Sequence, residues 1–326
     1  MKKPKLIIVS GMSGAGKSTT SQGIARLYSQ NGIHNHWYHE EMEEHPIRWA
    51  NGGEFKAGNL KTEEGMTLNI EDMFERWSRF LDNISAIGGI HVMEGCLYQN
   101  IIHYFFSGGY LKEKVIIYYD KLMEILDRVE TRIIFLYSKD VRATLEKAFE
   151  VRGENWKQLI LDPGDDQYFQ IHGYDGDCSV FAMWEDYRNL SDKVFSRYKG
   201  SKLKVEVDKT TRQWDVHMRK IAEFLDLKYF EREEAELRDK SRYCGRLYNS
   251  EGKKLSLSVS CVNDQLFFNT SWFKYIKMVS IGQDQFELSA FPTILSYRFE
   301  SGIKRVEISG NYGWDINGEN FEIKME

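Results

Sequence analysis

The stretch LIIVSGMSGAGKSTT, residues 6–20, lies almost at the start of the chain and decides the fold of its first part. Residues 6–9 form a short, continuously apolar run, which is typical of a strand buried on both faces of a parallel sheet. Residues 11–18 match the pattern G-x-x-x-x-G-K-[ST] in full. Glycines let the backbone N–H groups of such a loop turn toward a polyphosphate, and the helix that begins near Lys17 directs its positive dipole end there. The stretch therefore predicts a phosphate-binding loop between a strand and a helix.

The loop assigns roles to its own side chains. Lys17 is expected to reach the terminal phosphates of a bound nucleotide, and the hydroxyl of Ser18 to bind Mg²⁺. The residues expected to contact the nucleotide are Gly11, Ser13, Gly14, Ala15, Gly16, Lys17, Ser18 and Thr19.

Composition limits the partners of the chain. With 326 residues the chain is long enough for two domains. Its 44 Lys and Arg against 49 Asp and Glu give a net charge of −5, which offers no electrostatic footprint for nucleic acid or an anionic membrane. The four cysteines are scattered without metal or redox spacing, and no apolar run is long enough to span a membrane. We expect a cytoplasmic protein with reduced thiols.

Apolar runs alternate with helical patterns as far as residue 229. Strands are expected at 33–39, 90–93, 133–137 and 203–207, in addition to 6–9. Helices are expected at 17–30, from an Asn69 cap to Gly88, from an Asp140 cap through residue 150, and along 214–225. This alternation predicts an α/β fold, with a parallel sheet covered by helices on both faces.

The pattern changes after residue 229. Residues 230–242 are mostly charged, which indicates a linker or a solvated connecting helix. Residues 243–326 alternate with period two between turn signals, so we expect a small antiparallel barrel or sandwich there. A barrel resembling the small lipocalin-like barrels appended to other enzymes is expected to cover substrate, dimerise or bind a protein partner.

The loop, the strand before it and the helix after it resemble the P-loop nucleoside triphosphate hydrolase superfamily, and within it the nucleoside and nucleotide kinase branch. The likeness extends over about residues 4–228. It implies an ATP-dependent kinase that moves the γ-phosphoryl group of Mg-ATP to a small-molecule acceptor: a nucleoside, a nucleotide or an antibiotic-like hydroxyl. A GTPase is disfavoured because the sequence contains no N-K-x-D.

The resemblance extends to the acid that ends the strand at 90–93. Similar kinases carry an acidic residue there, usually followed by Arg, whereas this chain has Glu94 followed by Gly95. Glu94 is expected to hold Mg²⁺ through water or to orient a water molecule. Capping of the next helix is the alternative role for this carboxylate.

A second group of acids follows the strand at 33–39, in the sequence WYHEEMEEHPIRW, residues 37–49. In similar kinases an acid at this place takes the proton of the acceptor hydroxyl, so Glu40 is the first candidate for the base and Glu41 the second. The same acids, together with His39 and His45, are also compatible with a metal site or with a solvated acidic face.

The remaining site candidates lie in other loops. Glu41, Arg48, Tyr98 and Gln99 are expected to bind the acceptor. Similar kinases carry arginines on a mobile lid after the fourth strand, which makes Arg152 the first candidate to stabilise the transferred group, before Arg142 and Lys147. Residues 161–179 hold five aspartates and little periodicity, so we expect a loop beside the site.

Two other functions stay open. The chain could be an ATP-binding switch or regulatory protein whose C-terminal domain binds a partner. A polynucleotide-end kinase is a third reading, which the acidic charge balance disfavours. The identity of the acceptor and the oligomeric state leave no trace in the sequence.

Overall fold

The computed structural model describes most of the chain: residues 4–40, 42, 45–47, 62–110, 112–164, 166–207, 214–231, 237, 239–249, 252–270, 273–282, 284–300, 303–310 and 320–324. The chain divides into two compact units. The first comprises residues 1–40, 44–147 and 160–230, and the second comprises residues 41–43, 148–159 and 231–326.

The first unit is built on a parallel sheet of five strands, which confirms the predicted α/β class. The strand order is β2 (Asn35–Tyr38), β3 (Ile90–Glu94), β1 (Leu6–Gly11), β4 (Thr131–Ser138) and β5 (Ser201–Val207). Every residue of β1 and β3 is buried, as their apolar sequences require. Since all five strands run in parallel, their carboxyl ends lie along one edge of the sheet.

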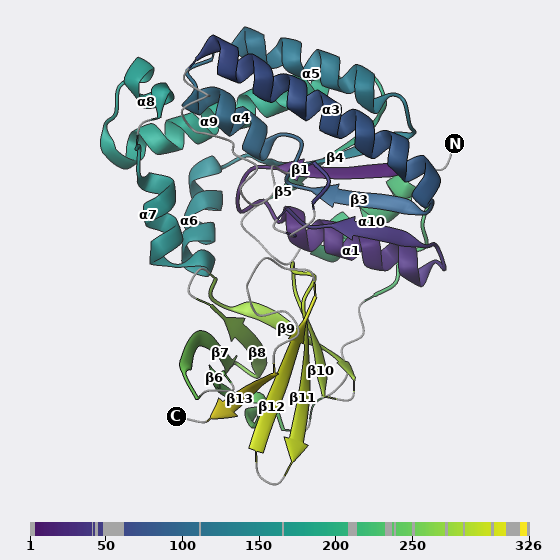
Figure 1. The fold of residues 1–326 in the computed structure, drawn as a ribbon, viewed down its shortest axis with the longest axis vertical. Helices are drawn as coiled ribbons and strands as arrows, with labels where there is room; N and C mark the ends of the chain where they lie inside the picture. Colours follow the sequence, from purple (N-terminus) through teal and green to yellow (C-terminus); the bar gives the residue numbers. More distant parts are fainter. Residues whose placement is uncertain are drawn as a thin grey trace. The chain divides into compact units, whose positions relative to one another are not determined.

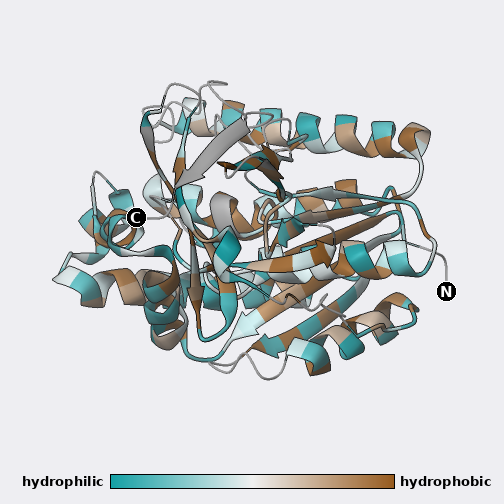
Figure 2. Ribbon diagram, turned by 90° about the horizontal axis from the view of Figure 1, so that it is seen from below, coloured by the Kyte–Doolittle hydropathy of each residue, from teal (hydrophilic) through white to brown (hydrophobic). Residues whose placement is uncertain are grey.

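Helices cover both faces of this sheet (Figure 1). α1 (Lys17–Gln30) and α10 (Trp214–Leu225) lie together on one face. The other face carries α3 (Glu63–Ile87), α4 (Gln99–Ser107), α5 (Lys112–Leu126) and α9 (Gly176–Arg197), and the short α8 (Gln167–His172) packs against α4. Hydrophobic and hydrophilic residues alternate along the helices in Figure 2, as amphipathic helices packed on one side require.

Local side-chain bonds explain where three helices begin. Asp140 caps α6 (Val141–Arg152) as predicted, because its Oδ1 accepts from the Ala143 backbone N–H at 2.9 Å. The predicted Asn69 cap is wrong: α3 begins at Glu63, where Thr62 Oγ1 accepts from Gly65 N–H at 3.1 Å. The loop expected at 161–179 instead contains α8, whose cap Asp166 accepts from Tyr168 N–H at 2.8 Å.

The second unit contains a closed antiparallel barrel. Its strands are β6 (Gly245–Tyr248), β7 (Lys254–Val262), β8 (Gln265–Asn269), β9 (Ile276–Gly282), β10 (Gln285–Leu288), β11 (Ile294–Glu300), β12 (Ile303–Ser309) and β13 (Asn320–Lys324). They close in the order β10-β11-β12-β13-β6-β7-β8-β9. Of the predicted barrel and sandwich, the structure has the barrel, and inward side chains such as Phe268, Phe286 and Leu295 fill its core.

Residues outside the barrel sequence belong to the same unit. The end of α6 and most of α7 (Glu154–Leu161) group with the barrel, and Lys274 N–H donates to the Val151 carbonyl at 2.8 Å. A short 3-10 turn, Ser241–Tyr243, precedes β6; much of the predicted 230–242 linker lies outside the described residues. Within the described residues, no helix is both long and apolar enough to cross a membrane.

Candidate active site

The predicted phosphate-binding loop lies between β1 and α1, and close packing determines its first glycine. A Cβ atom on Gly11 would lie 2.7 Å from the backbone oxygen of Leu136 on β4. Gly16, just before α1, has a left-handed φ of +86°, and a Cβ there would meet nothing within 4 Å. Gly11 is therefore required by the neighbouring strand, whereas Gly16 is required by the turn into the helix.

The residues of the loop differ in their exposure to solvent. Gly14 and Gly16 are exposed and Ser18 and Thr19 are half-buried, whereas Ser13 and Ala15 are buried. Lys17 is only 5% exposed, and its Nζ donates to the Met12 carbonyl oxygen at 3.3 Å. The lysine thus lies folded back over the loop, where its charge faces the backbone that would surround a phosphate.

Glu94 ends β3 beside the loop. It is fully buried, and its Oε1 accepts from the Ser18 hydroxyl at 3.1 Å. Burial raises the pKa of the Glu94 carboxyl, the negative charge of Glu40 raises it further, and the charge of Lys17 lowers it. Ser18, in the first turn of α1, and Glu94, at the end of β3, are the two residues predicted to hold Mg²⁺, and they are in direct contact.

Glu40 lies in the same place, two residues after the end of β2. Its backbone N–H donates to Glu94 Oε1 at 3.1 Å, and its side chain is 9% exposed. His39 Nε2 lies 3.7 Å from the same oxygen, in a side chain that is 3% exposed. The ends of β1, β2 and β3 thus bring together a hydroxyl, a lysine and two carboxyl groups.

Tyr187 is a site residue that the sequence reasoning missed. It lies on α9, is almost fully buried, and donates from its hydroxyl to the Gly11 carbonyl at 3.3 Å. Burial raises the pKa of the Tyr187 hydroxyl, and the charge of Glu40 adds to the effect. Buried positions 180, 184, 187, 191 and 194 recur at helical spacing, a signal that could have found α9.

Four residues were expected to contact an acceptor. Tyr98 is fully buried, with its ring edge-on to Tyr119 at 5.5 Å and to Phe135 at 5.7 Å, which favours a packing role. Gln99 is the first residue of α4, and its side chain lies outside the described part of the chain. Glu41 and Arg48 also lie outside the described residues.

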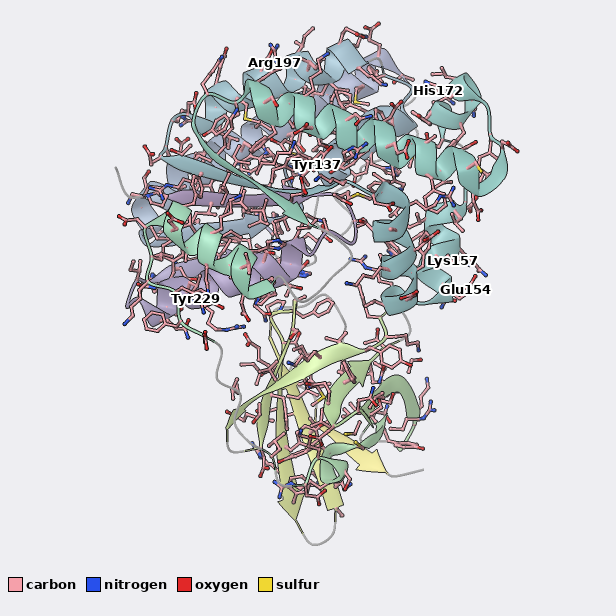
Figure 3. The ribbon with its side chains drawn as sticks, turned by 180° about the vertical axis from the view of Figure 1, so that it is seen from behind. Tyr137, Glu154, Lys157, His172, Arg197 and Tyr229 are labelled. Carbon is pink, nitrogen blue, oxygen red and sulfur yellow. The ribbon has the colours of Figure 1, made fainter. Side chains whose placement is uncertain are left out.

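The candidate lid arginines have aromatic partners. The guanidinium of Arg152 lies 4.6 Å from the ring centre of Trp156 and 5.1 Å from that of Phe273, both in the second unit. Near it on α7, Glu154 and Lys157 form an ion pair of 3.8 Å (Figure 3). Arg142 lies over Phe181 at 3.9 Å and pairs with Glu146 four residues on, as its spacing predicts.

The Ser18–Glu94 pair has the donor set that Mg²⁺ prefers, a hydroxyl and a carboxylate. Glu94 Oε2 is buried and has no hydrogen-bond partner within the described part of the chain, so it is available to a cation or its water. The described residues hold no group of three or more His, Cys, Asp or Glu side chains placed to bind a metal. The alternative metal site formed by the acids after β2 with His39 and His45 is not tested by this, because residues 41, 43 and 44 lie outside the described residues.

Comparisons with known proteins agree with this fold. A family model described as an AAA domain matches residues 7–136, which include the loop and Glu94. No curated protein matches the sequence.

Three solved structures are distantly similar. An unliganded sugar kinase from Janibacter sp. is 10% identical over 69% of this chain and 95% of its own, with a TM-score of 0.35. Deoxyadenosine kinase from M. mycoides with bound dATP is 13% identical over 67% and 98%, with a TM-score of 0.34. A eukaryotic dimethylallyltransferase acting on tRNA is 12% identical over 78% and 91%, with a TM-score of 0.30. The first unit therefore combines a phosphate-binding loop with a five-stranded parallel sheet in the order β2-β3-β1-β4-β5, and the AAA match includes that loop.

Proposed function

We propose that this chain is an ATP-dependent phosphotransferase that moves the γ-phosphoryl group of Mg-ATP to a small-molecule hydroxyl. The observation that carries the proposal is the 3.1 Å contact between Ser18 and Glu94, with Lys17 and Glu40 at the same end of the sheet. A loop that only bound a nucleotide would not need the carboxyl group of Glu40 beside that of Glu94.

Each residue has a distinct task in this reaction. The loop N–H groups and Lys17 bind the β- and γ-phosphates and hold them in line with the acceptor. Ser18 and Glu94 would hold Mg²⁺, which when bound neutralises charge on the phosphates. Glu40, which lies beside Glu94, accepts the proton of the acceptor hydroxyl as that oxygen attacks. Burial of Lys17, Glu40 and Glu94 strengthens the charge interactions among them.

Replacing Lys17 tests the proposal. Lys17→Ala removes the positive charge nearest the transferred group, so we expect transfer to fall by about 100-fold or more. Lys114→Ala is the matched control, because Lys114 is half exposed on α5 and pairs with Glu63. Products are measured by mass spectrometry, with ATP offered together with nucleosides, nucleotides, sugars and aminoglycosides.

Two outcomes would contradict the proposal. Full transfer activity in Lys17→Ala would remove the loop from the reaction. Net ATP hydrolysis by the wild type without any phosphorylated acceptor across the panel would favour the nucleotide-dependent switch instead. Thermal unfolding of each variant without nucleotide, compared with the wild type, confirms that the variant is folded.

A further inference from the structure

The residue after Glu94 is a glycine that the Glu40 side chain covers. Gly95 has a left-handed φ of +74°. A Cβ atom built on Gly95 would lie 2.2 Å from Glu40 Oε2, 2.8 Å from its Cβ and 3.0 Å from its Cδ. Since real Cβ contacts almost never fall below 3.0 Å, a side chain at position 95 would require the Glu40 side chain to leave its present place.

The place beside Gly95 holds two buried carboxyl groups, those of Glu40 and Glu94. Glu40 and Glu94 are both at least nine-tenths buried, and the Glu40 backbone N–H bonds to the Glu94 carboxylate at 3.1 Å. Glu94 Oε2 is buried, and no described residue hydrogen-bonds to it. Two acids so placed repel each other, and they repel a negatively charged group on the acceptor, which, unlike the phosphates of Mg-ATP, brings no Mg²⁺ with it.

We propose that Gly95 is a specificity-determining residue. Because Gly95 has no side chain, the Glu40 carboxylate occupies the space beside it and restricts the acceptor to an alcohol that carries no phosphate. The acceptor is an uncharged or cationic alcohol, and phosphomonoesters are excluded. The inference rests on the proposed phosphotransferase function, since it names the substrate class of the same site.

The chemistry follows from this geometry. The acceptor oxygen bonds to the γ-phosphorus as the bond from that phosphorus to the β,γ-bridging oxygen breaks, and ADP leaves with the electron pair. The acceptor proton passes to the Glu40 carboxylate. A phosphate on the acceptor would bring more negative charge beside two carboxyl groups, whereas an ammonium group would be attracted.

A double-mutant cycle tests the contact independently of activity. Gly95→Ala places a Cβ against Glu40, and we expect its Tm to fall by about 5 °C. In a Glu40→Ala background the clash is gone, so the same change should cost less than half of that. Gly32→Ala is the control, because Gly32 has a similar φ of +70° and no atom within 4 Å of a Cβ. Equal Tm losses in the two backgrounds would overturn the inference.

Matched acceptor pairs test the substrate class. Each nucleoside, hexose or amino sugar is offered beside its own monophosphate with Mg-ATP, and kcat/KM is measured for both. We expect at least about tenfold lower kcat/KM for the phosphorylated member. Gly95→Arg, which displaces Glu40 and adds a cation, should narrow that ratio, whereas Gly32→Arg should leave it unchanged.

The outcomes separate the two proposals. Preference for the phosphorylated acceptors, with transfer still lost in Lys17→Ala, would overturn the acceptor class and leave the phosphotransferase in place. Absence of any phosphorylated product from either member of every pair would overturn the phosphotransferase, and the acceptor class would fall with it.

Discussion

His91 is a core histidine that the fold holds in its neutral form, and we predict that it makes the first unit acid-sensitive. The ring is fully buried on β3 and lies 4.9 Å from the ring of His36, nearly parallel to it. Its Nε2 lies 3.1 Å from the Gly88 carbonyl, which can only accept, so Nε2 carries the proton. Its Nδ1, 2.9 Å from the Tyr38 hydroxyl, therefore accepts. A second proton has no place in this arrangement.

The size of the effect follows from the pKa of His91. Burial, followed by the neighbouring His36, lowers the pKa of His91 from 6.5 to about 4. Below pH 6.5 His91 binds a proton in the unfolded chain, whereas in the folded chain it does so only near pH 4. The free energy of unfolding therefore decreases as the pH falls between these two values. At about 1.4 kcal/mol per pH unit, stability falls by about 2 kcal/mol at pH 5 and by about 3 kcal/mol at pH 4.

Replacement of the ring isolates this contribution. The free energy of unfolding in urea, followed by the fluorescence of the buried Trp77, is measured at pH 7 and pH 5 for the wild type and His91→Gln. The wild type should lose about 2 kcal/mol more than the variant, because glutamine does not titrate. His172→Gln is the control, since His172 is exposed on α8 (Figure 3) and should leave the loss unchanged. An equal loss in wild type and His91→Gln would refute the reasoning.

Two further predictions concern the loop. Gly11→Ala should destabilise the first unit by about 1–3 kcal/mol, because the added Cβ meets the backbone oxygen of Leu136. Gly16→Ala adds a Cβ that meets no atom within 4 Å, so its loss of stability should be smaller than that of Gly11→Ala. Urea unfolding measures both losses, and a larger loss for Gly16→Ala would count against the packing of Gly11 on β4. Tyr187→Phe removes the hydrogen bond to the Gly11 carbonyl and should raise KM for ATP several-fold with a smaller change in kcat. Steady-state kinetics test this expectation, and an unchanged KM would show that Tyr187 does not position the loop.

The sequence could predict which residues lie at this edge of the sheet because the ends of buried strands are visible in the sequence. An apolar run followed by a polar residue marks the end of a buried strand, and parallel strands end at one edge. Ser18 was predicted from the loop motif, and Glu40 and Glu94 from their places at strand ends together with the kinase resemblance; the structure brings the three residues into contact or within one hydrogen bond. The kinase role of each residue stays a proposal.

Other features depended on contacts that no local pattern encodes. Tyr98 was expected to face an acceptor because it is polar and follows Glu94, but aromatic neighbours from α5 and β4 enclose its ring. Asn69 has good capping chemistry, yet Thr62 and the acids after it begin α3 earlier. Tyr187 reaches the loop from a helix more than 150 residues away in the chain, a contact that only the tertiary fold reveals.

Two buried charges in one sheet differ in how their hydrogen bonding is completed. Arg132, at the start of β4, is 1% exposed, and its Nη1 donates to the Phe224 carbonyl at 2.7 Å while its guanidinium lies over the Phe224 ring. The charged group of Arg132 thus holds α10 against the sheet through its contacts with Phe224. Glu94 is as deeply buried at the other end of the neighbouring strands, but one of its oxygens has no partner among the described residues, and a second carboxyl group beside it adds repulsion. Under the proposed function a bound cation would complete this arrangement, because Glu94 Oε2 has no hydrogen-bond partner among the described residues.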